Sequence, residues 1–165
     1  MKKLRVMVDI NVILDVLENR NGWVMDAAKT CAVCGGGMRA IGFVPPHAVT
    51  TIYYIVRKRG GKALADKAID WLLALFKVAD CGTDEFKAAR ASGIDDYEDA
   101  VVVASAQKTG CDYIVTRNTV HFKVSPVPVM TPADFAAKFR EKSKFAFWQC
   151  LAMIFDPLLR EGALF

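Results

Sequence analysis

The sequence predicts an α/β fold, a three-layer α/β/α sandwich with a mostly parallel central sheet. Short apolar runs of strand character alternate with longer segments of helical periodicity along the chain. This alternation is typical of parallel sheets covered by helices. The first apolar run contains Val6 and Val8, which are β-branched and flanked by further apolar residues. Such a run is expected for a strand that is buried on both faces of a parallel sheet.

The composition limits the classes of protein to which the chain can belong. The chain has 165 residues, of which 53% are hydrophobic and 24% are charged, enough for one globular domain with its own core. A formal net charge of +4 permits a polyanionic partner but does not require one. Lys2, Lys3 and Arg5 lead into the first strand without a small-residue cleavage site. We therefore expect no signal peptide and a cytoplasmic protein that does not enter a membrane.

The cysteines are expected to be reduced thiols. Their number is five, which is odd, and the domain already has a core. Cys31 and Cys34 form an isolated C-x-x-C motif, but the chain has no second such pair and only two histidines. We interpret these two residues as part of a buried helix end rather than as a zinc or redox site.

The first part of the chain reads as strand, helix, helix and strand. Asn11 follows the first strand and is expected to cap a helix over residues 12–17. A second helix is predicted over residues 21–34, where the glycine run 35–37 ends it. A short strand is predicted over residues 39–44.

A helical hairpin and another strand follow. Apolar residues have helical spacing over residues 47–58 and again over residues 62–75, and Gly60–Gly61 separates the two segments. Residues 76–79 are a predicted strand. Thr83 is expected to cap the helix that follows it.

The last third repeats the alternation. Residues 95–99 are an acidic helix start ahead of the apolar segment 100–106. A strand within residues 112–118 ends in a polar cluster, and residues 127–130 are the final predicted strand. Thr131 is followed by Pro and, three positions on, by Asp, a pattern that predicts another helix start.

Three polar clusters are predicted at one edge of the sheet. Asp9 follows the first strand, Asp96 and Asp99 lie on one side of a first helical turn, and residues 116–118 follow a later strand. Ligands collect at this edge in open α/β sheets. Clustered carboxylates are costly unless a cation neutralises them, and oxygen ligands suit Mg²⁺ or Mn²⁺. The alternative is structural: a turn-stabilising Asp9 and an ordinary capped helix at Asp96.

These clusters resemble the motifs of the PIN-domain family, metal-dependent nucleases that include the VapC-type toxins of bacterial toxin–antitoxin pairs. The resemblance runs from about residue 4 to residue 139. Residues 8–15 are similar to the opening D-x-N motif, residues 96–100 to the central acidic helix start, and residues 116–122 to the T-R-[ND]…F motif.

The resemblance implies an endoribonuclease that depends on Mg²⁺ or Mn²⁺, forms a homodimer and has an antitoxin partner. It implies Asp9 and Asp99 as the principal metal ligands and Asp96 as an accessory acid of the metal site. Asn118 would complete the catalytic group, with Thr116, Asn11 and Thr51 as supporting polar residues.

The sequence also departs from the family pattern. Thr51 stands at about the place where many PIN domains have a Glu, and Asn118 and His121 stand where Asp is common. The alternative function is therefore a catalytically weak PIN-like module that binds RNA or an antitoxin. A phosphotransferase with Asp9 as nucleophile is a third reading. It is disfavoured because Asn11 occupies the place of the second Asp of that class.

Basic residues are candidates for contacts with the RNA backbone, because phosphate affinity comes mainly from Lys and Arg. Arg117 lies next to the predicted site, and Arg57, Lys58 and Arg59 end a predicted helix. The alternative for the last three is a solvated helix end.

The PIN-like nuclease domain is assigned to residues 1–139 and an apolar helical extension to residues 140–165. Residues 145–155 are almost wholly apolar, yet too short a stretch to span a bilayer. We expect this extension to pack against a second subunit or a partner.

Overall fold

The computed structural model describes residues 2–35 and 40–139. The predicted extension over residues 140–165 lies outside the described residues. The elements in chain order are β1 (Leu4–Val8), α1 (Ile10–Leu17), α2 (Val24–Gly35), β2 (Ala40–Val44), α3 (Pro46–Leu75), β3 (Lys77–Val78), α4 (Thr83–Ala91), α5 (Tyr97–Thr109), β4 (Tyr113–Val115), the 3₁₀ helix η1 (Thr119–Phe122), β5 (Val129–Met130) and α6 (Pro132–Lys138).

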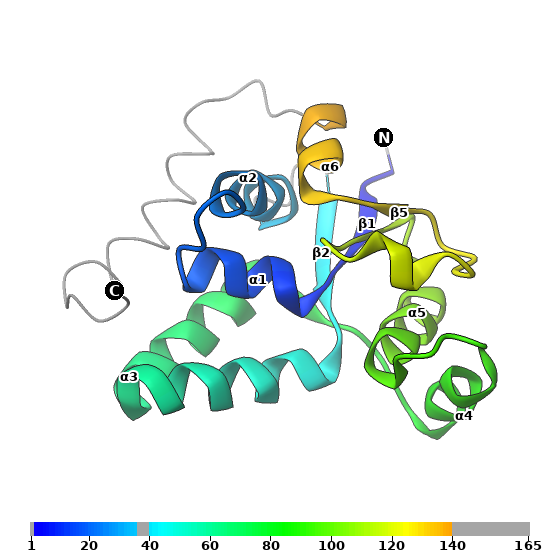
Figure 1. The fold of residues 1–165 in the computed structure, drawn as a ribbon, viewed down its shortest axis with the longest axis horizontal. Helices are drawn as coiled ribbons and strands as arrows, with labels where there is room; N and C mark the ends of the chain where they lie inside the picture. Colours follow the sequence, from blue (N-terminus) through cyan, green and yellow to red (C-terminus); the bar gives the residue numbers. More distant parts are fainter. Residues whose placement is uncertain (1, 36–39, 140–165) are drawn as a thin grey trace.

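The strands form one sheet in the order β3-β2-β1-β4-β5, and every pairing in it is parallel (Figure 1). From β1 the chain moves outward to β2 and β3 on one side, then returns to place β4 and β5 on the other. The strand order therefore reverses next to β1. In open α/β sheets the crevice at such a reversal is where ligands bind.

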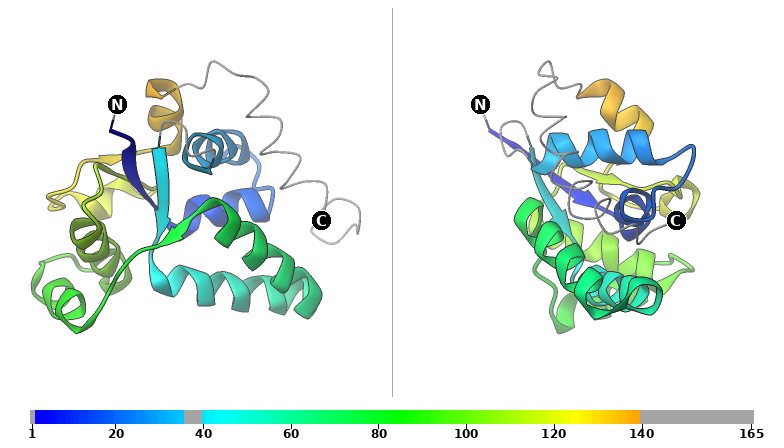
Figure 2. Two further views of the ribbon diagram at one scale, coloured as in Figure 1. Left: turned by 180° about the vertical axis from the view of Figure 1, so that it is seen from behind. Right: turned by 90° about the vertical axis from the view of Figure 1, so that its left-hand side faces the viewer.

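Helices cover both faces of the sheet, which confirms the predicted three-layer sandwich (Figure 2). Successive residues of a strand point to opposite faces. Val6 and Val8 accordingly pack with α1, α2 and α3, and α6 joins this layer through Phe135. Met7 and Ile114 point to the other face and pack with α5.

Three predicted helix starts are wrong by one to three residues. The first helix is capped by Asp9 rather than by Asn11, because the Asp9 carboxylate accepts a hydrogen bond from the Ile10 amide. The second helix begins at Val24, after a turn in which Gly22 has a φ of +83°. The cap of α4 is Gly82, and Thr83 is the first helical residue.

The predicted break at Gly60–Gly61 is confirmed as a kink within α3. Gly61 has φ 80° and ψ 179°, a conformation essentially restricted to glycine. The first half of α3 starts at the sheet edge and runs away from it, and the second half returns toward β3 (Figures 1 and 2). Within the described residues, no helix combines the length and the apolar character needed to cross a bilayer.

Candidate active site

Asp9 is held rigidly at the carboxyl end of β1. The residue is buried, with 3% of its surface exposed, and it caps α1. Its Oδ1 accepts a hydrogen bond from the Ile10 amide at 2.7 Å. Its Oδ2 accepts hydrogen bonds from Asn11 Nδ2 at 2.6 Å and from Thr116 Oγ1 at 2.7 Å. Both oxygens are therefore fixed in direction.

Thr116 joins this corner to the loop that follows β4. Its fully buried hydroxyl donates to Asp9 and accepts from the Asn118 amide at 3.1 Å and from Asn11 Nδ2 at 3.1 Å. The Asn11 side-chain oxygen accepts in turn from the Arg117 amide at 3.3 Å. The predicted supporting residues Asn11 and Thr116 thus connect the ends of two neighbouring strands.

Asp99 approaches the same loop from the first turn of α5. His121 Nδ1 lies 2.9 Å from Asp99 Oδ2 and 2.6 Å from Asn118 Nδ2. Nδ1 donates to the carboxylate when it carries a proton and accepts from Asn118 Nδ2 when it does not. The structure therefore brings Asp99 and Asn118 together through His121. In the sequence, His121 was notable only because it stands where Asp is common in the family.

Asp96 is the cap of α5. Its Oδ1 accepts hydrogen bonds from the Glu98 amide at 2.8 Å and from the Asp99 amide at 3.2 Å. These are the contacts of a helix cap, which the sequence offered as the structural alternative to a metal-site role for Asp96. Its negative charge nevertheless acts on the site, because it raises the pKa of Asp99.

The carboxylates lie in an unfavourable electrostatic environment. Burial raises the pKa of Asp9 to about 6, the charges of Asp99 and Glu98 raise it too, and the hydrogen bond from Thr116 opposes them. Burial also raises the pKa of Asp99, against the hydrogen bond with His121. Two partly desolvated carboxylates that repel each other are stabilised by a cation.

The donor set fits a hard divalent cation that retains water ligands. Within residues 2–35 and 40–139, no three His, Cys, Asp or Glu side chains form a ready-made metal cage. Mg²⁺ usually binds proteins through only one or two carboxylates and takes its other ligands from water and phosphate. Asp9 and Asp99 each contact the segment after β4, and carboxylate oxygens suit Mg²⁺ or Mn²⁺.

His47 and Glu98 are neighbours of the site that the sequence analysis missed. His47 lies in the first turn of α3, and its Nε2 is 3.3 Å from Glu98 Oε1. Burial lowers the pKa of His47, while the charges of Glu98 and Asp99 act against burial. The available signal was position: His47 follows the second strand after only two prolines, at the edge of the sheet where Asp9 follows the first strand. Thr51, one turn further along the helix, shares its face with His47.

Arg117 is held in an ion pair beside the site. Its Nε lies 3.1 Å from Oδ2 of the fully buried Asp15, and its guanidinium lies 5.2 Å from the centre of the Trp23 ring. A quarter of the Arg117 side chain is exposed. Arg20 Nη1 also reaches Asp15, at 3.5 Å. The guanidinium of Arg117 is therefore engaged in packing the loop onto α1.

The basic residues of α3 lie apart from the acids. Arg57, Lys58 and Arg59 are exposed and immediately precede the kink, the part of α3 that is distant from the sheet edge (Figure 1). Arg59 pairs with Glu18 after α1. The structure does not bring these three residues to Asp9.

Comparisons with known proteins agree with this architecture. No curated protein matches the chain in sequence. The structure of VapBC2 from Rickettsia felis, bound to a DNA fragment from its promoter, contains a similar chain with a TM-score of 0.60 and 14% identity, covering 78% of this chain and 98% of that one. VapBC-1 from nontypeable Haemophilus influenzae gives a TM-score of 0.59 and 13% identity, with coverage of 79% and 99%.

A family model provides the assignment. The PIN domain model matches residues 5–120, which is most of the chain. That range contains Asp9, Asp96, Asp99, Thr116 and Asn118. The predicted resemblance is confirmed, and the chain belongs to the PIN-domain family.

Proposed function

We propose that this chain is a divalent-metal-dependent endoribonuclease that hydrolyses RNA phosphodiester bonds and serves as the toxin of a cytoplasmic toxin–antitoxin pair. The observation that carries the proposal is that Asp9 and Asp99, two carboxylates with raised pKa values, both contact the segment after β4 at the strand reversal of a PIN fold. Membership of the PIN-domain family supports nuclease chemistry at this place.

Asp9 and Asp99 would hold Mg²⁺ or Mn²⁺, with Asp96 adding negative charge. When bound, the cation supplies an activated water and neutralises charge on the phosphate. The remaining residues orient these ligands: Thr116 and Asn11 fix Oδ2 of Asp9. His121 fixes Oδ2 of Asp99, and Asn118 restrains the His121 ring.

Contacts with the RNA backbone are proposed for the exposed cations Arg57, Lys58 and Arg59. Arg117 can contribute through the exposed quarter of its side chain while its Nε stays with Asp15. Such contacts supply affinity that weakens with salt.

An antitoxin partner and a homodimer belong to the same proposal. Two structurally similar chains come from VapBC complexes, which supports an antitoxin for this chain. The extension over residues 140–165 is proposed as a packing or interface segment. The alternative function, a catalytically weak RNA- or antitoxin-binding module, is favoured by the uncharged Thr51 and Asn118 and by His121.

Cleavage of a mixed RNA pool tests the proposal. The purified chain, without antitoxin, is incubated with Mg²⁺, with Mn²⁺ or with EDTA beside its Asp9→Asn variant. Asp84→Asn, which removes an exposed acid in the first turn of α4, is the matched control. We expect cutting that needs metal, disappears in Asp9→Asn and persists in Asp84→Asn. Intact RNA in every lane would instead favour the binding module.

A further inference from the structure

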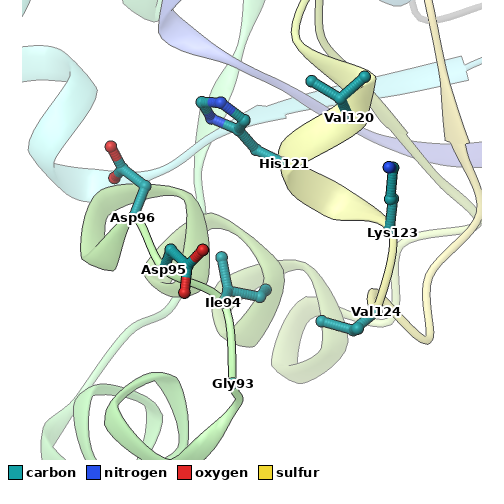
Figure 3. Close-up of a pocket in the computed structure, with 8 residues that line it drawn as sticks. All are labelled: Gly93, Ile94, Asp95, Asp96, Val120, His121, Lys123 and Val124. Carbon is teal, nitrogen blue, oxygen red and sulfur yellow. The ribbon is translucent and has the colours of Figure 1, made fainter.

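A pocket of about 270 Å³ opens beside the acids (Figure 3). One side is the segment that joins α4 to α5, and the other is η1 with the residues that follow it. Its lining consists of Gly93, Ile94, Asp95, Asp96, Val120, His121, Lys123 and Val124. His121 belongs to both places, since its Nδ1 lies 2.9 Å from Asp99. A ligand in this pocket is therefore adjacent to the candidate active site.

The lining combines apolar sides with opposite charges. Ile94 and Val124 point toward each other from the two sides of the pocket, with Asp95 and Lys123 beside them (Figure 3). Val120 is 60% exposed and Val124 62% exposed, so their apolar surface is available to a ligand. Aliphatic side chains on two sides of a narrow space suit a flat ring.

We propose that this pocket binds one base of the RNA substrate, that the preferred base is guanine, and that Asp95 is the specificity-determining residue. This inference rests on the ribonuclease function proposed above. The volume lies just below the roughly 300–1,000 Å³ of pockets for larger small molecules, which suits a single base. Sequence-specific recognition of RNA commonly uses single-stranded bases read on their Watson–Crick edges.

Asp95 carries the preference for guanine. Its carboxylate is exposed and accepts no hydrogen bond from any residue in the described part of the chain. An ionised carboxylate only accepts hydrogen bonds and has two oxygens side by side. Guanine presents two adjacent donors, N1–H and the N2 amino group, which one carboxylate can accept together. Uracil presents a single ring N–H, and adenine and cytosine each present one amino group.

Lys123 supplies a positive charge for the phosphate of a bound nucleotide. It is exposed and forms no ion pair with any described residue. An exposed lysine in the lining can contact the phosphate attached to the bound base. The base matches the apolar side chains and the acid of this lining, and the phosphate matches its lysine. A protein partner would cover a much larger area than this pocket, about 800 Å² on each side of an interface.

Nucleoside monophosphates test the pocket without involving cleavage, because they contain no internucleotide bond. The four 5′-monophosphates are titrated separately into the purified chain in EDTA. Methyl resonances of Ile94, Val120 and Val124 are followed by NMR. We expect guanosine monophosphate to bind roughly fivefold more tightly than each of the others, the lower end of what a bidentate base contact provides. Equal affinities, or no shift of these methyl groups, would overturn the inference.

Two pairs of variants assign the roles. Asp95→Asn should remove the guanine preference, whereas Asp84→Asn, which deletes the same charge from an exposed position on α4, should keep it. Lys123→Gln should weaken all four nucleotides equally, whereas Lys87→Gln should not. An unchanged preference in Asp95→Asn would rule out its role.

Cleavage then separates this inference from the proposed function. Cut sites mapped on a mixed RNA should cluster next to guanine in the wild type and lose this bias in Asp95→Asn. Metal-dependent cutting without any guanine bias would refute the pocket assignment alone. The absence of cutting with either metal would refute the ribonuclease function, whatever the nucleotides show.

Discussion

The hydroxyl of Thr116 connects the two strand ends that form the candidate site. It is fully buried, donates to Asp9 and accepts from the Asn118 amide. Its hydrogen bond also lowers the pKa of Asp9 against the effect of burial. Replacing the Thr116 hydroxyl by a methyl group is therefore expected to alter both the direction of the Asp9 carboxylate and its pKa.

Replacing Thr116 by Val should reduce activity roughly 10- to 100-fold, the usual effect of losing a group that orients a metal ligand. Because the hydrogen bond that lowers the pKa of Asp9 is lost, the acidic limb of the kcat/KM profile should move to higher pH. Thr116→Ser retains the hydroxyl and should keep the wild-type limb. Identical limbs in the Val and Ser variants would show that this hydroxyl does not tune Asp9.

The ionised Asp9 carboxylate should lower the free energy of unfolding in the absence of metal. Burial raises its pKa from 3.8 to about 6, so the folded protein binds the proton more tightly than the unfolded chain does. The cost is absent below about pH 3.8, grows as the pH rises, and is complete above about pH 6. Asn is an equally good helix cap and carries no charge.

In EDTA, the effect of Asp9→Asn on the free energy of unfolding should be more favourable at pH 7 than near pH 4, by on the order of 1–3 kcal/mol. The Asn amide nitrogen faces one of the donors that bind Asp9, and the hydrogen bond lost there costs the same at both pH values. Urea unfolding at a series of pH values measures the difference, with the exposed Asp84→Asn as control. A difference between variant and wild type that does not change with pH would contradict the raised pKa.

At the scale of elements, the loop after β4 is fixed to α1 by a buried ion pair. Asp15 is fully buried within α1, and Arg117 reaches it from the loop at 3.1 Å. Burial raises the pKa of Asp15, and the charges of Arg117 and Arg20 oppose that rise. The pair thereby holds Thr116 and Asn118 over the end of β1.

Arg117→Met should destabilise the protein by roughly 2–3 kcal/mol, because it leaves a buried charge with only Arg20 as partner. Combining it with Asp15→Asn should recover much of this loss, since the uncompensated charge is then removed as well. Urea unfolding of the two single variants and the double variant gives the coupling energy. Additive effects would show that the two side chains act independently.

The elements that could be predicted are those with local patterns. The apolar residues of β1 and β4, the paired glycines of α3 and the capping Asp96 are each visible within a few residues of sequence. The contacts that could not be predicted join distant residues. His47 meets Glu98, and Arg117 meets Asp15, only after the sheet has brought β2, α5 and α1 to one edge. Side-chain partners across the fold have no periodicity from which they could be inferred.

At the scale of the whole molecule, the proposed metal should stabilise the fold by mass action. A ligand that binds only the folded state contributes about 2.7 kcal/mol at 100 times its Kd. For a chain of this size, that corresponds to a rise in Tm of roughly 5–10 °C. Thermal unfolding with and without Mn²⁺ measures this rise. Asp9→Asn should show little or none of it, and an equal rise in this variant would place the ion elsewhere.

The span of the hydrogen bond between Thr116 and Asp9, 107 residues, has a consequence for protein synthesis. A nascent chain that has left the ribosome only as far as α4 contains Asp9 but neither Thr116 nor the loop that carries Asn118 and His121. The acids cannot be assembled until nearly the whole domain has emerged. A protein that cleaves RNA would in this way spare the ribosome and message that are still making it.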